Sequence, residues 1–221
     1  MTADRPAPCL NWMRPRGLLL DAMGTLIGLR RSVGHTYAAA AAEHGLQVRA
    51  AAIDRVFPQV LRQAPPLAFA HRCAADLETA ERRWWAERIA AALQLAGAEA
   101  MPAALGQDLF ERFADTALWQ VYPDVAPQLQ AWHAAGLKLA VVSNFDGRLQ
   151  GLLEGLGLMR WLGPVVVSSR AGAAKPSPRP FLLALEALEL GPEEAWHIGD
   201  SPEDAEGAAA AGLRCLLVRR P

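Results

Sequence analysis

Residues 18–28 read LLLDAMGTLIG, so three leucines run into Asp21 and the chain then turns through Gly24 and Thr25. A short apolar run that ends on an acid indicates a buried parallel strand whose carboxyl end faces a ligand site. Four more apolar runs follow, with helical stretches between them that begin near Ser or Asp and end near Gly. The sequence therefore predicts an α/β fold with a doubly wound parallel sheet. The predicted strands are residues 16–23, 137–144, 163–169, 194–200 and 214–220.

Residues 32–118 interrupt this alternation and read as helix throughout. The stretch contains a Ser-led, Gly-ended segment at 32–45 and a long amphipathic segment at 74–97. Because it follows the first strand directly, we expect a core formed by residues 1–31 and 119–221 and an inserted helical cap formed by residues 32–118.

Composition excludes several classes of function. The 221 residues are 52% hydrophobic and 20% charged, which is enough for a full core, and the net charge of -1 predicts no nucleic-acid partner. No apolar run is long enough to cross a bilayer, and residues 1–17 lack the apolar segment of a signal peptide, so we expect a cytoplasmic protein without a membrane partner. Cys9, Cys73 and Cys215 are widely separated, which predicts reduced thiols rather than disulfides or zinc ligands.

Polar residues stand where three of the predicted strands end. Ligands bind beyond the carboxyl ends of parallel strands, and these ends share one edge of the sheet, so we expect the polar side chains to converge there. One lysine from the loop between the third and fourth strands is expected to join them. The set is Asp21, Ser143, Asn144, Lys175, Asp200 and Asp204.

These residue types indicate a site for a cation and an anion. Two carboxylates about 4 Å apart repel by roughly 4 kcal/mol at an effective dielectric near 20, so a cation or proton is needed between them. Oxygen ligands in a small, partly hydrated cavity favour Mg²⁺. Lys175 is one of two lysines among 22 basic residues, which favours a role as a compact positive charge over a role in surface solubility. Ser143 and Asn144 suit an anionic oxygen, or else cap the next helix.

Four short segments carry a resemblance to a known family. DAMGTL, SNFD, KPSPRPF and GDSPED occur in this order around the helical insertion. Together they resemble the four motifs of the haloacid dehalogenase-like (HAD) hydrolase superfamily, in the subfamily with a helical cap after the first motif. SNFDGRL, the WW pair and LWQVYPDV are similar to the branch of uncharacterised HAD-like hydrolase domain-containing proteins. The resemblance covers the chain from about residue 17 onward and implies a Rossmann-like core.

The family mechanism implies a role for each matching residue. Asp21 would attack a small phosphorylated substrate to form an aspartyl intermediate that water hydrolyses, and Lys175 would steady it. The implied substrate-binding residues are Thr25, Ser143 and Asn144. The implied Mg²⁺ site is Asp21, the backbone carbonyl of Met23, Asp200 and, in support, Asp204.

Met23 departs from the usual motif of the family's phosphatases, which place a second acid there. That acid protonates the leaving group and is commonly worth 10² to 10⁴ in rate. Either another group supplies the proton, with His35 as one candidate, or the leaving group needs none. The alternative reading of His35 is a solvated or capping histidine.

Two other functions stay open under the same resemblance. Haloacid dehalogenases also lack the second acid and need no metal, although Asp200 and Asp204 are more typical of a metal-dependent phosphatase. A catalytically weakened protein that binds a phosphometabolite or a partner is the second alternative. A third function is excluded. Phosphonate-cleaving members of the family use a lysine of the cap, and no lysine occurs between residues 1 and 137, so this chain lacks the residue for that chemistry. The sequence specifies neither the substrate nor an oligomeric state.

Overall fold

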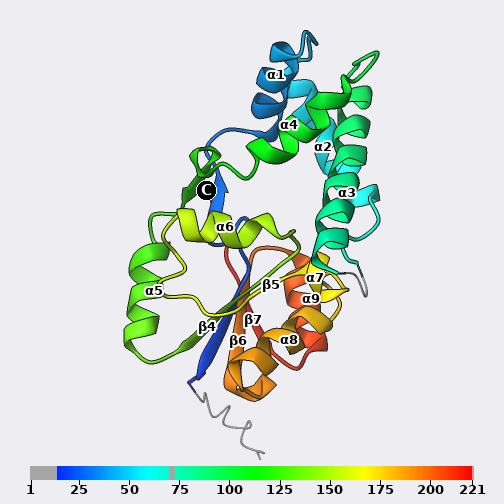
Figure 1. The fold of residues 1–221 in the computed structure, drawn as a ribbon. Coiled ribbons are helices and arrows are strands. Elements are labelled where there is room, and N and C mark those ends of the chain that lie inside the picture. Colours follow the sequence, from blue (N-terminus) through cyan, green and yellow to red (C-terminus); the bar gives the residue numbers. More distant parts are fainter. Residues whose placement is uncertain (1–13, 70–72, 221) are drawn as a thin grey trace, which may run out of the picture.

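The computed structural model describes residues 14–69 and 73–220 (Figure 1). In this part of the chain, five parallel strands form a sheet in the order β5-β4-β1-β6-β7, which confirms the predicted doubly wound α/β fold. The first strand lies between the second and the fourth predicted strands, so the chain changes direction across the sheet at β1. The strands are β1 (Gly17–Leu20), β4 (Lys138–Ser143), β5 (Val165–Val167), β6 (Ala195–Gly199) and β7 (Arg214–Leu217).

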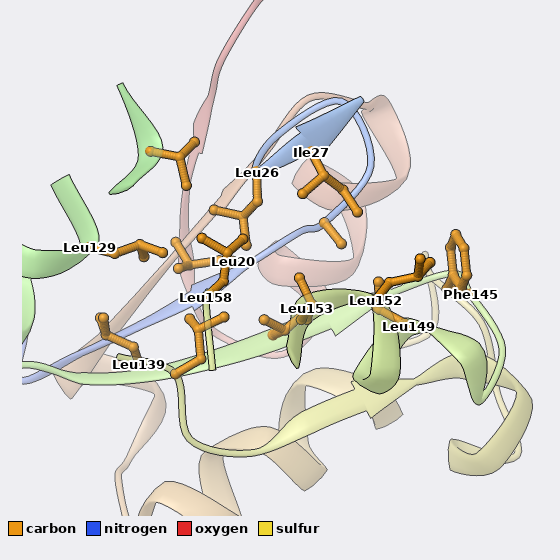
Figure 2. Packing of buried hydrophobic residues seen from close by; sticks show 14 of the residues in the cluster. Leu20, Leu26, Ile27, Leu129, Leu139, Phe145, Leu149, Leu152, Leu153 and Leu158 are labelled. Atoms are coloured by element: carbon orange, nitrogen blue, oxygen red, sulfur yellow. The ribbon is translucent and has the colours of Figure 1, made fainter. Parts of the chain in front are cut away.

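Helices cover both faces of this sheet, and alternate side chains of β1 pack on opposite faces. Leu18 and Leu20 belong to the core cluster that includes Leu152 of α6 (Figure 2), while Leu19 packs in a second cluster with Phe181 of α8. Strands buried on both faces have no polar side to alternate with, which explains the continuous apolar runs in the sequence. The core helices are α5 (Val125–Ala134), α6 (Arg148–Gly155), α8 (Arg179–Leu188) and α9 (Pro202–Ala210).

Four helices from the inserted region pack together beyond one end of the sheet (Figure 1). They have a hydrophobic cluster of their own, which includes Tyr37, Ile53, Ile89 and Leu105. Ser32 caps the first of them by accepting a hydrogen bond from the His35 amide, as the Ser-led pattern predicts. The division into a core of residues 1–31 and 119–221 and a cap of residues 32–118 stays a prediction. The helices are α1 (Val33–Glu43), α2 (Ala50–Gln63), α3 (Ala74–Leu95) and α4 (Ala103–Arg112).

The helical insertion contacts the core through a buried carboxylate. Glu81 of α3 is 3% exposed and accepts hydrogen bonds from the Gly147 amide at 3.0 Å and from Ser169 Oγ at 2.5 Å. One turn further along α3, Trp85 Nε1 donates to Asp146 Oδ2 at 2.6 Å. These contacts join α3 to the start of α6.

Some short elements differ from the sequence expectation. The third predicted strand ends at Val167, and Ser168–Ala171 forms helix α7, because both serine side chains there bond to groups of the insertion. A two-stranded antiparallel sheet was not predicted at all, since three residues are too few for a periodic pattern. The elements not predicted individually are helix α4, β2 (Ile27–Leu29), β3 (Trp119–Val121) and the 3₁₀ turns η1 (Thr116–Leu118) and η2 (Pro192–Glu194).

Among the described residues, none of the helices combines the length and apolar character that crossing a membrane requires. Cys73 and Cys215 are free thiols, in agreement with the sequence, whereas Cys9 lies outside the described residues. The cytoplasmic location stays a prediction.

Candidate active site

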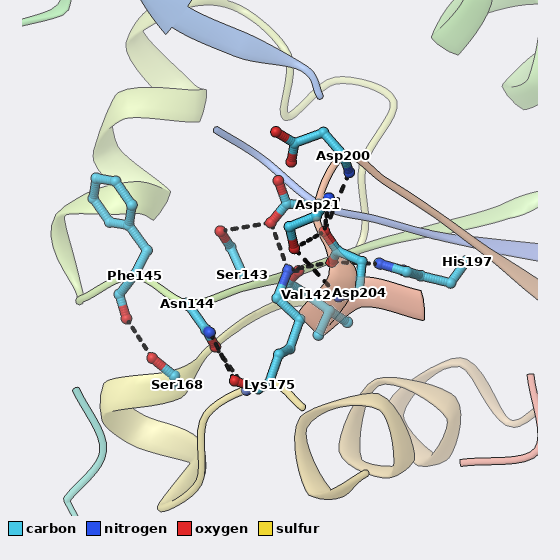
Figure 3. Close-up of polar contacts among 11 residues, drawn as sticks. Asp21, Val142, Ser143, Asn144, Phe145, Ser168, Lys175, His197, Asp200 and Asp204 are labelled. Carbon is cyan, nitrogen blue, oxygen red and sulfur yellow. Dashed lines mark hydrogen bonds and ion pairs between the residues drawn. The ribbon is translucent and has the colours of Figure 1, made fainter. Parts of the chain in front are cut away.

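The predicted site residues meet at the carboxyl edge of the sheet (Figure 3). Asp21 follows β1, Ser143 ends β4 and Asp200 follows β6. Because β1 lies between β4 and β6, these three strand ends are adjacent. This is the point at which the strand order reverses, where open α/β sheets bind their ligands.

Lys175 lies in the centre of this group and is 6% exposed. Its Nζ atom is 2.6 Å from Oδ1 of Asp21, 2.6 Å from Oδ1 of Asp204 and 3.1 Å from the Val142 carbonyl oxygen. Burial lowers the pKa of Lys175, but attraction to Asp21 and Asp204 outweighs this effect and leaves the pKa above its ordinary value. The side chain is therefore a fixed positive charge next to the Asp21 carboxylate.

Asn144 holds the backbone of Lys175 in place. Its Nδ2 donates to the Lys175 carbonyl oxygen at 3.0 Å, and its Oδ1 accepts from the Lys175 amide at 2.7 Å. Both ends of the Asn144 amide thus orient the loop that carries the lysine. A contact between Asn144 and a substrate stays a prediction.

Asp204 has both carboxylate oxygens occupied by the protein itself. Besides Lys175, Oδ1 is 2.8 Å from Nε2 of the buried His197, and Oδ2 accepts from Ser201 Oγ at 2.8 Å and from two backbone amides at 3.1 and 3.2 Å. Burial alone would raise the pKa of Asp204, but the hydrogen bond from His197 and the charge of Lys175 hold that pKa far below its usual range. Asp204 is therefore ionised and orients the Lys175 ammonium through their ion pair.

His197 and Ser201 were both missed by the sequence analysis. Ser201 could have been found, because Ser-x-x-Asp before an apolar helix is a capping-box pattern, and the structure has that box at the start of α9. His197 carries no such signal, since it lies inside an apolar strand and its partner is defined only by the fold.

Asp200 differs from Asp204 because no side chain in residues 14–69 and 73–220 donates a hydrogen bond to its carboxylate. Burial, together with repulsion from Asp21 and Asp204, raises the pKa of Asp200 from 3.8 to about 6. One carboxylate oxygen of each of the three acids lies within 4.8 Å of the others. Lys175 pairs with two of these three carboxylates, and the all-oxygen donor set fits a hard divalent cation.

The turn after β1 carries one buried hydroxyl without a hydrogen-bond partner and one carbonyl that takes no part in the hydrogen bonds of the turn, as far as the described residues go. Thr25 is 2% exposed, and its Oγ1 has no hydrogen-bond partner among the described residues. The amides of Thr25, Leu26 and Ile27 all donate to the Ala22 carbonyl, while the Gly24 amide donates to the Ile27 carbonyl. The Met23 carbonyl accepts none of these bonds. A buried hydroxyl without a partner calls for a ligand oxygen.

Gly24 allows this turn to approach Asp200. Its φ of +86° lies in the left-handed region, and a Cβ added to it would overlap the Asp200 carboxylate. Ser143 Oγ completes the arrangement by donating to Asp21 Oδ1 at 3.1 Å.

The side chain of Met23 is 44% exposed and lines a cavity of ≈ 90 Å³ between α1–α4 and the core. His35, one candidate for a substitute proton donor and otherwise a solvated or capping histidine, does not line this cavity. It lies beside Arg31 in a separate pocket that is also lined by Arg112 and Asp115. The structure thus brings six polar residues together as the sequence predicts and leaves His35 outside the set.

Comparison with known proteins finds the same family that the sequence motifs resemble. The family model for haloacid dehalogenase-like hydrolase matches residues 15–212. Haloacid dehalogenase-like hydrolase domain-containing protein 3 of Bos taurus is 36% identical over 214 residues, which cover 93% of this chain and 82% of that protein. Phosphoserine phosphatase of Thermus thermophilus is 37% identical over 110 residues, covering 49% of this chain and 44% of the phosphatase.

Comparison with solved structures also supports this family assignment. The structure of L-2-haloacid dehalogenase from Xanthobacter autotrophicus matches with a TM-score of 0.67 and 26% identity, covering 92% of this chain and 77% of that one. The family model spans most of the sequence and includes every residue of the carboxylate and lysine cluster. The chain therefore belongs to the haloacid dehalogenase-like hydrolase family and is a hydrolase.

Proposed function

We propose that this hydrolase is a Mg²⁺-dependent phosphatase that cleaves a small phosphorylated metabolite through an aspartyl intermediate on Asp21. The observation that carries the proposal is the cluster of Asp21, Asp200 and Asp204, in which Lys175 pairs with Asp21 and Asp204 while burial and its two acidic neighbours raise the pKa of Asp200 to about 6. Such mutual repulsion is relieved by a cation among the carboxylates.

The ligands for this cation follow from the contacts already present. The available oxygens are the carboxylate of Asp200, Oδ2 of Asp21 and the carbonyl of Met23, because Asp204 is saturated by hydrogen bonds. Asp204 then supports the site through Lys175 instead of binding the metal directly. When bound, Mg²⁺ supplies positive charge to the phosphoryl oxygens.

The residues of the chain divide the remaining tasks. Asp21 forms a bond to phosphorus as the leaving-group oxygen departs, and water then cleaves the acyl phosphate to give inorganic phosphate and free Asp21. Lys175 and Ser143 orient Asp21 through Oδ1 and lie within reach of phosphoryl oxygens beside it. The unpartnered Oγ1 of Thr25 is a third donor for these oxygens.

We further propose that α1–α4 act as a cap over this site. The contacts from Glu81 and Trp85 hold α3 against the start of α6, next to the end of β4. Met23 faces the space between the two parts and brings no proton donor to it.

A dehalogenase is the second candidate, favoured by the apolar Met23 and by the similarity to L-2-haloacid dehalogenase. Asp200 and Asp204 oppose it, because a second and third carboxylate beside the nucleophile repel a carboxylate substrate unless a cation is present. A catalytically weakened binding protein is the third candidate, because Met23 supplies no proton donor and a binding protein needs none.

One screen separates the three candidates. The purified protein is assayed for phosphate release from aryl, acyl and alkyl phosphates, with Mg²⁺ or with EDTA, and for chloride release from 2-chloropropionate. We expect phosphate release that requires Mg²⁺ and that is absent from an Asp21→Asn preparation purified in the same way. Chloride release in EDTA would establish the dehalogenase instead, and tight phosphate binding without turnover would establish the binding protein.

A further inference from the structure

The cavity beside Met23 is lined almost entirely by hydrocarbon. Residues from α1–α4 and from the core contribute to its wall, and aromatic rings dominate it. The aromatic members include Tyr37, Phe57, Trp85, Phe110, Phe113 and Phe145.

The polar atoms of this wall are largely committed to other partners. Arg148 is the one charged residue of the lining, and its guanidinium bonds twice to Asp146 and, at 2.6 Å, to the Phe110 carbonyl oxygen. The indole N–H of Trp85 also donates to Asp146, and that of Trp119 donates to the Phe113 carbonyl oxygen at 3.1 Å. The cavity therefore offers a ligand ring faces, methyl groups and the hydroxyl of Tyr37, but no free charge.

The lining of the cavity includes a residue of the turn that follows Asp21. Met23 follows Asp21 by two residues and lines the cavity with a side chain that is 44% exposed. Leu61 of α2 also lines it and is 37% exposed, so the lining contains a second large apolar side chain that is accessible to water. Exposed apolar side chains around a cavity are typical of a ligand entrance.

We propose that this cavity binds the non-phosphate part of the substrate and selects for a small hydrocarbon group over a polyhydroxylated one. The proposal rests on the phosphatase function proposed above, with the phosphoryl group at Asp21 and the organic group extending past Met23. A sugar would bury several hydroxyls against a wall in which the Tyr37 hydroxyl can pair with at most one or two of them, which is costly, whereas each buried methylene is favourable.

The size of the cavity limits this group. Its volume of ≈ 90 Å³ is smaller than the ~150 Å³ of an engineered apolar cavity that binds benzene. The cavity in this conformation accepts a chain of a few carbon atoms.

Binding of n-alkylphosphonates tests the proposal without turnover, because their C–P bond is not cleaved by this chemistry. Methyl-, ethyl-, propyl- and butylphosphonate, 2,3-dihydroxypropylphosphonate and inorganic phosphate are titrated into the protein with Mg²⁺ by calorimetry. We expect Kd to fall by up to about 4-fold for each methylene until the cavity is full. The dihydroxypropyl compound should bind no more tightly than methylphosphonate.

Two variants and a matched control locate the effect. Leu61→Gln and Val33→Thr place polar atoms in the wall and should weaken the dependence on chain length while leaving the Kd of inorganic phosphate unchanged. Leu95→Gln changes an exposed leucine at the end of α3 that does not line the cavity, and it should behave as wild type.

The outcomes distinguish this inference from the proposed function. Equal Kd values for phosphate and for every phosphonate would overturn the hydrocarbon site and leave the phosphatase proposal intact. The hydrocarbon site would also be overturned if both cavity variants kept the wild-type dependence of Kd on chain length. The same holds if Leu95→Gln lost that dependence to the same extent as the cavity variants. Failure to bind even inorganic phosphate would overturn both.

Discussion

Nζ of Lys175 lies 2.6 Å from Oδ1 of Asp21, and both side chains are buried. The same ammonium is 2.6 Å from Asp204, so one cation stabilises two carboxylates, one directly after β1 and one in the first turn of α9. Removing one partner of a buried ion pair usually leaves an uncompensated charge. After substitution of Asp21, Lys175 would still be paired with Asp204. The variant therefore tests the role of Asp21 in the reaction without leaving Lys175 as an unpaired buried charge.

We expect Asp21→Asn to lower turnover by at least about 10³-fold while the protein remains folded, because the amide is not a nucleophile. Beryllofluoride with Mg²⁺ should raise the Tm of the wild type, by binding to the native state, but not that of the variant. Asp108→Asn, which changes a carboxylate in α4, is the control and should keep full activity. An Asp21→Asn variant that still turns over would refute the covalent mechanism.

We expect Asp200→Asn to remove the response to Mg²⁺. In the wild type, Mg²⁺ should raise the Tm measured by thermal shift, because the cation relieves repulsion among the three carboxylates. The variant should show little Mg²⁺-dependent shift and little activity. A Mg²⁺-dependent shift of unchanged size in the variant would place the cation elsewhere.

The raised pKa of Asp200 also predicts how the metal-free protein depends on pH. The folded state binds this proton up to about pH 6, whereas the unfolded state releases it near the ordinary value of 3.8. The folded state therefore holds more protons in this window, and the contribution of Asp200 to the free energy of unfolding declines as pH rises through it. Solvent screening of this exposed carboxylate keeps the effect small.

The measurement is the Tm of wild type and Asp200→Asn in EDTA from pH 4.5 to 7.5. The Tm of Asp200→Asn relative to wild type should increase across this range, because only the wild type acquires the repelled charge. A Tm difference that is constant, or that changes in the opposite direction, would contradict the pKa assigned to Asp200.

We expect Met23→Asp to raise the hydrolysis of alkyl phosphates by up to the 10² to 10⁴ that a general acid commonly supplies. Aryl phosphates should gain less, since phenolates leave without a proton. The ratio of alkyl to aryl turnover in the two proteins under saturating Mg²⁺ is the measurement. If the wild type already cleaves alkyl phosphates rapidly and the variant adds nothing, another group supplies the proton.

We expect Glu81→Ala to destabilise the protein by about 1–3 kcal/mol, because the Gly147 amide and the Ser169 hydroxyl lose their buried acceptor. For a chain of this size, each kcal/mol lowers Tm by about 2–4 °C. Glu78→Ala removes an exposed carboxylate of the same helix whose ion pair within the described residues is with Arg82, and it should change the stability by less than about 0.5 kcal/mol. Equal Tm values for the two variants would show that the Glu81 contact adds nothing.

The sequence by itself determined the sheet and the strand ends. Apolar runs of strand length had to be buried on both faces, and Asp21, Ser143 and Asp200 had to follow them at one edge because parallel strands share their carboxyl ends. The break in alternation likewise located the helices between β1 and β4, since helical periodicity is a local property.

Only the tertiary structure decided which side chains touch across that edge. It turned Asn144 toward the Lys175 backbone, brought His197 to Asp204 and left Thr25 Oγ1 without a partner. The contact of Trp85 with Asp146 joins residues 61 positions apart, and the apolar cavity exists only between elements brought together by such contacts. Local pattern cannot encode these pairings, because they depend on how independently formed elements pack against each other.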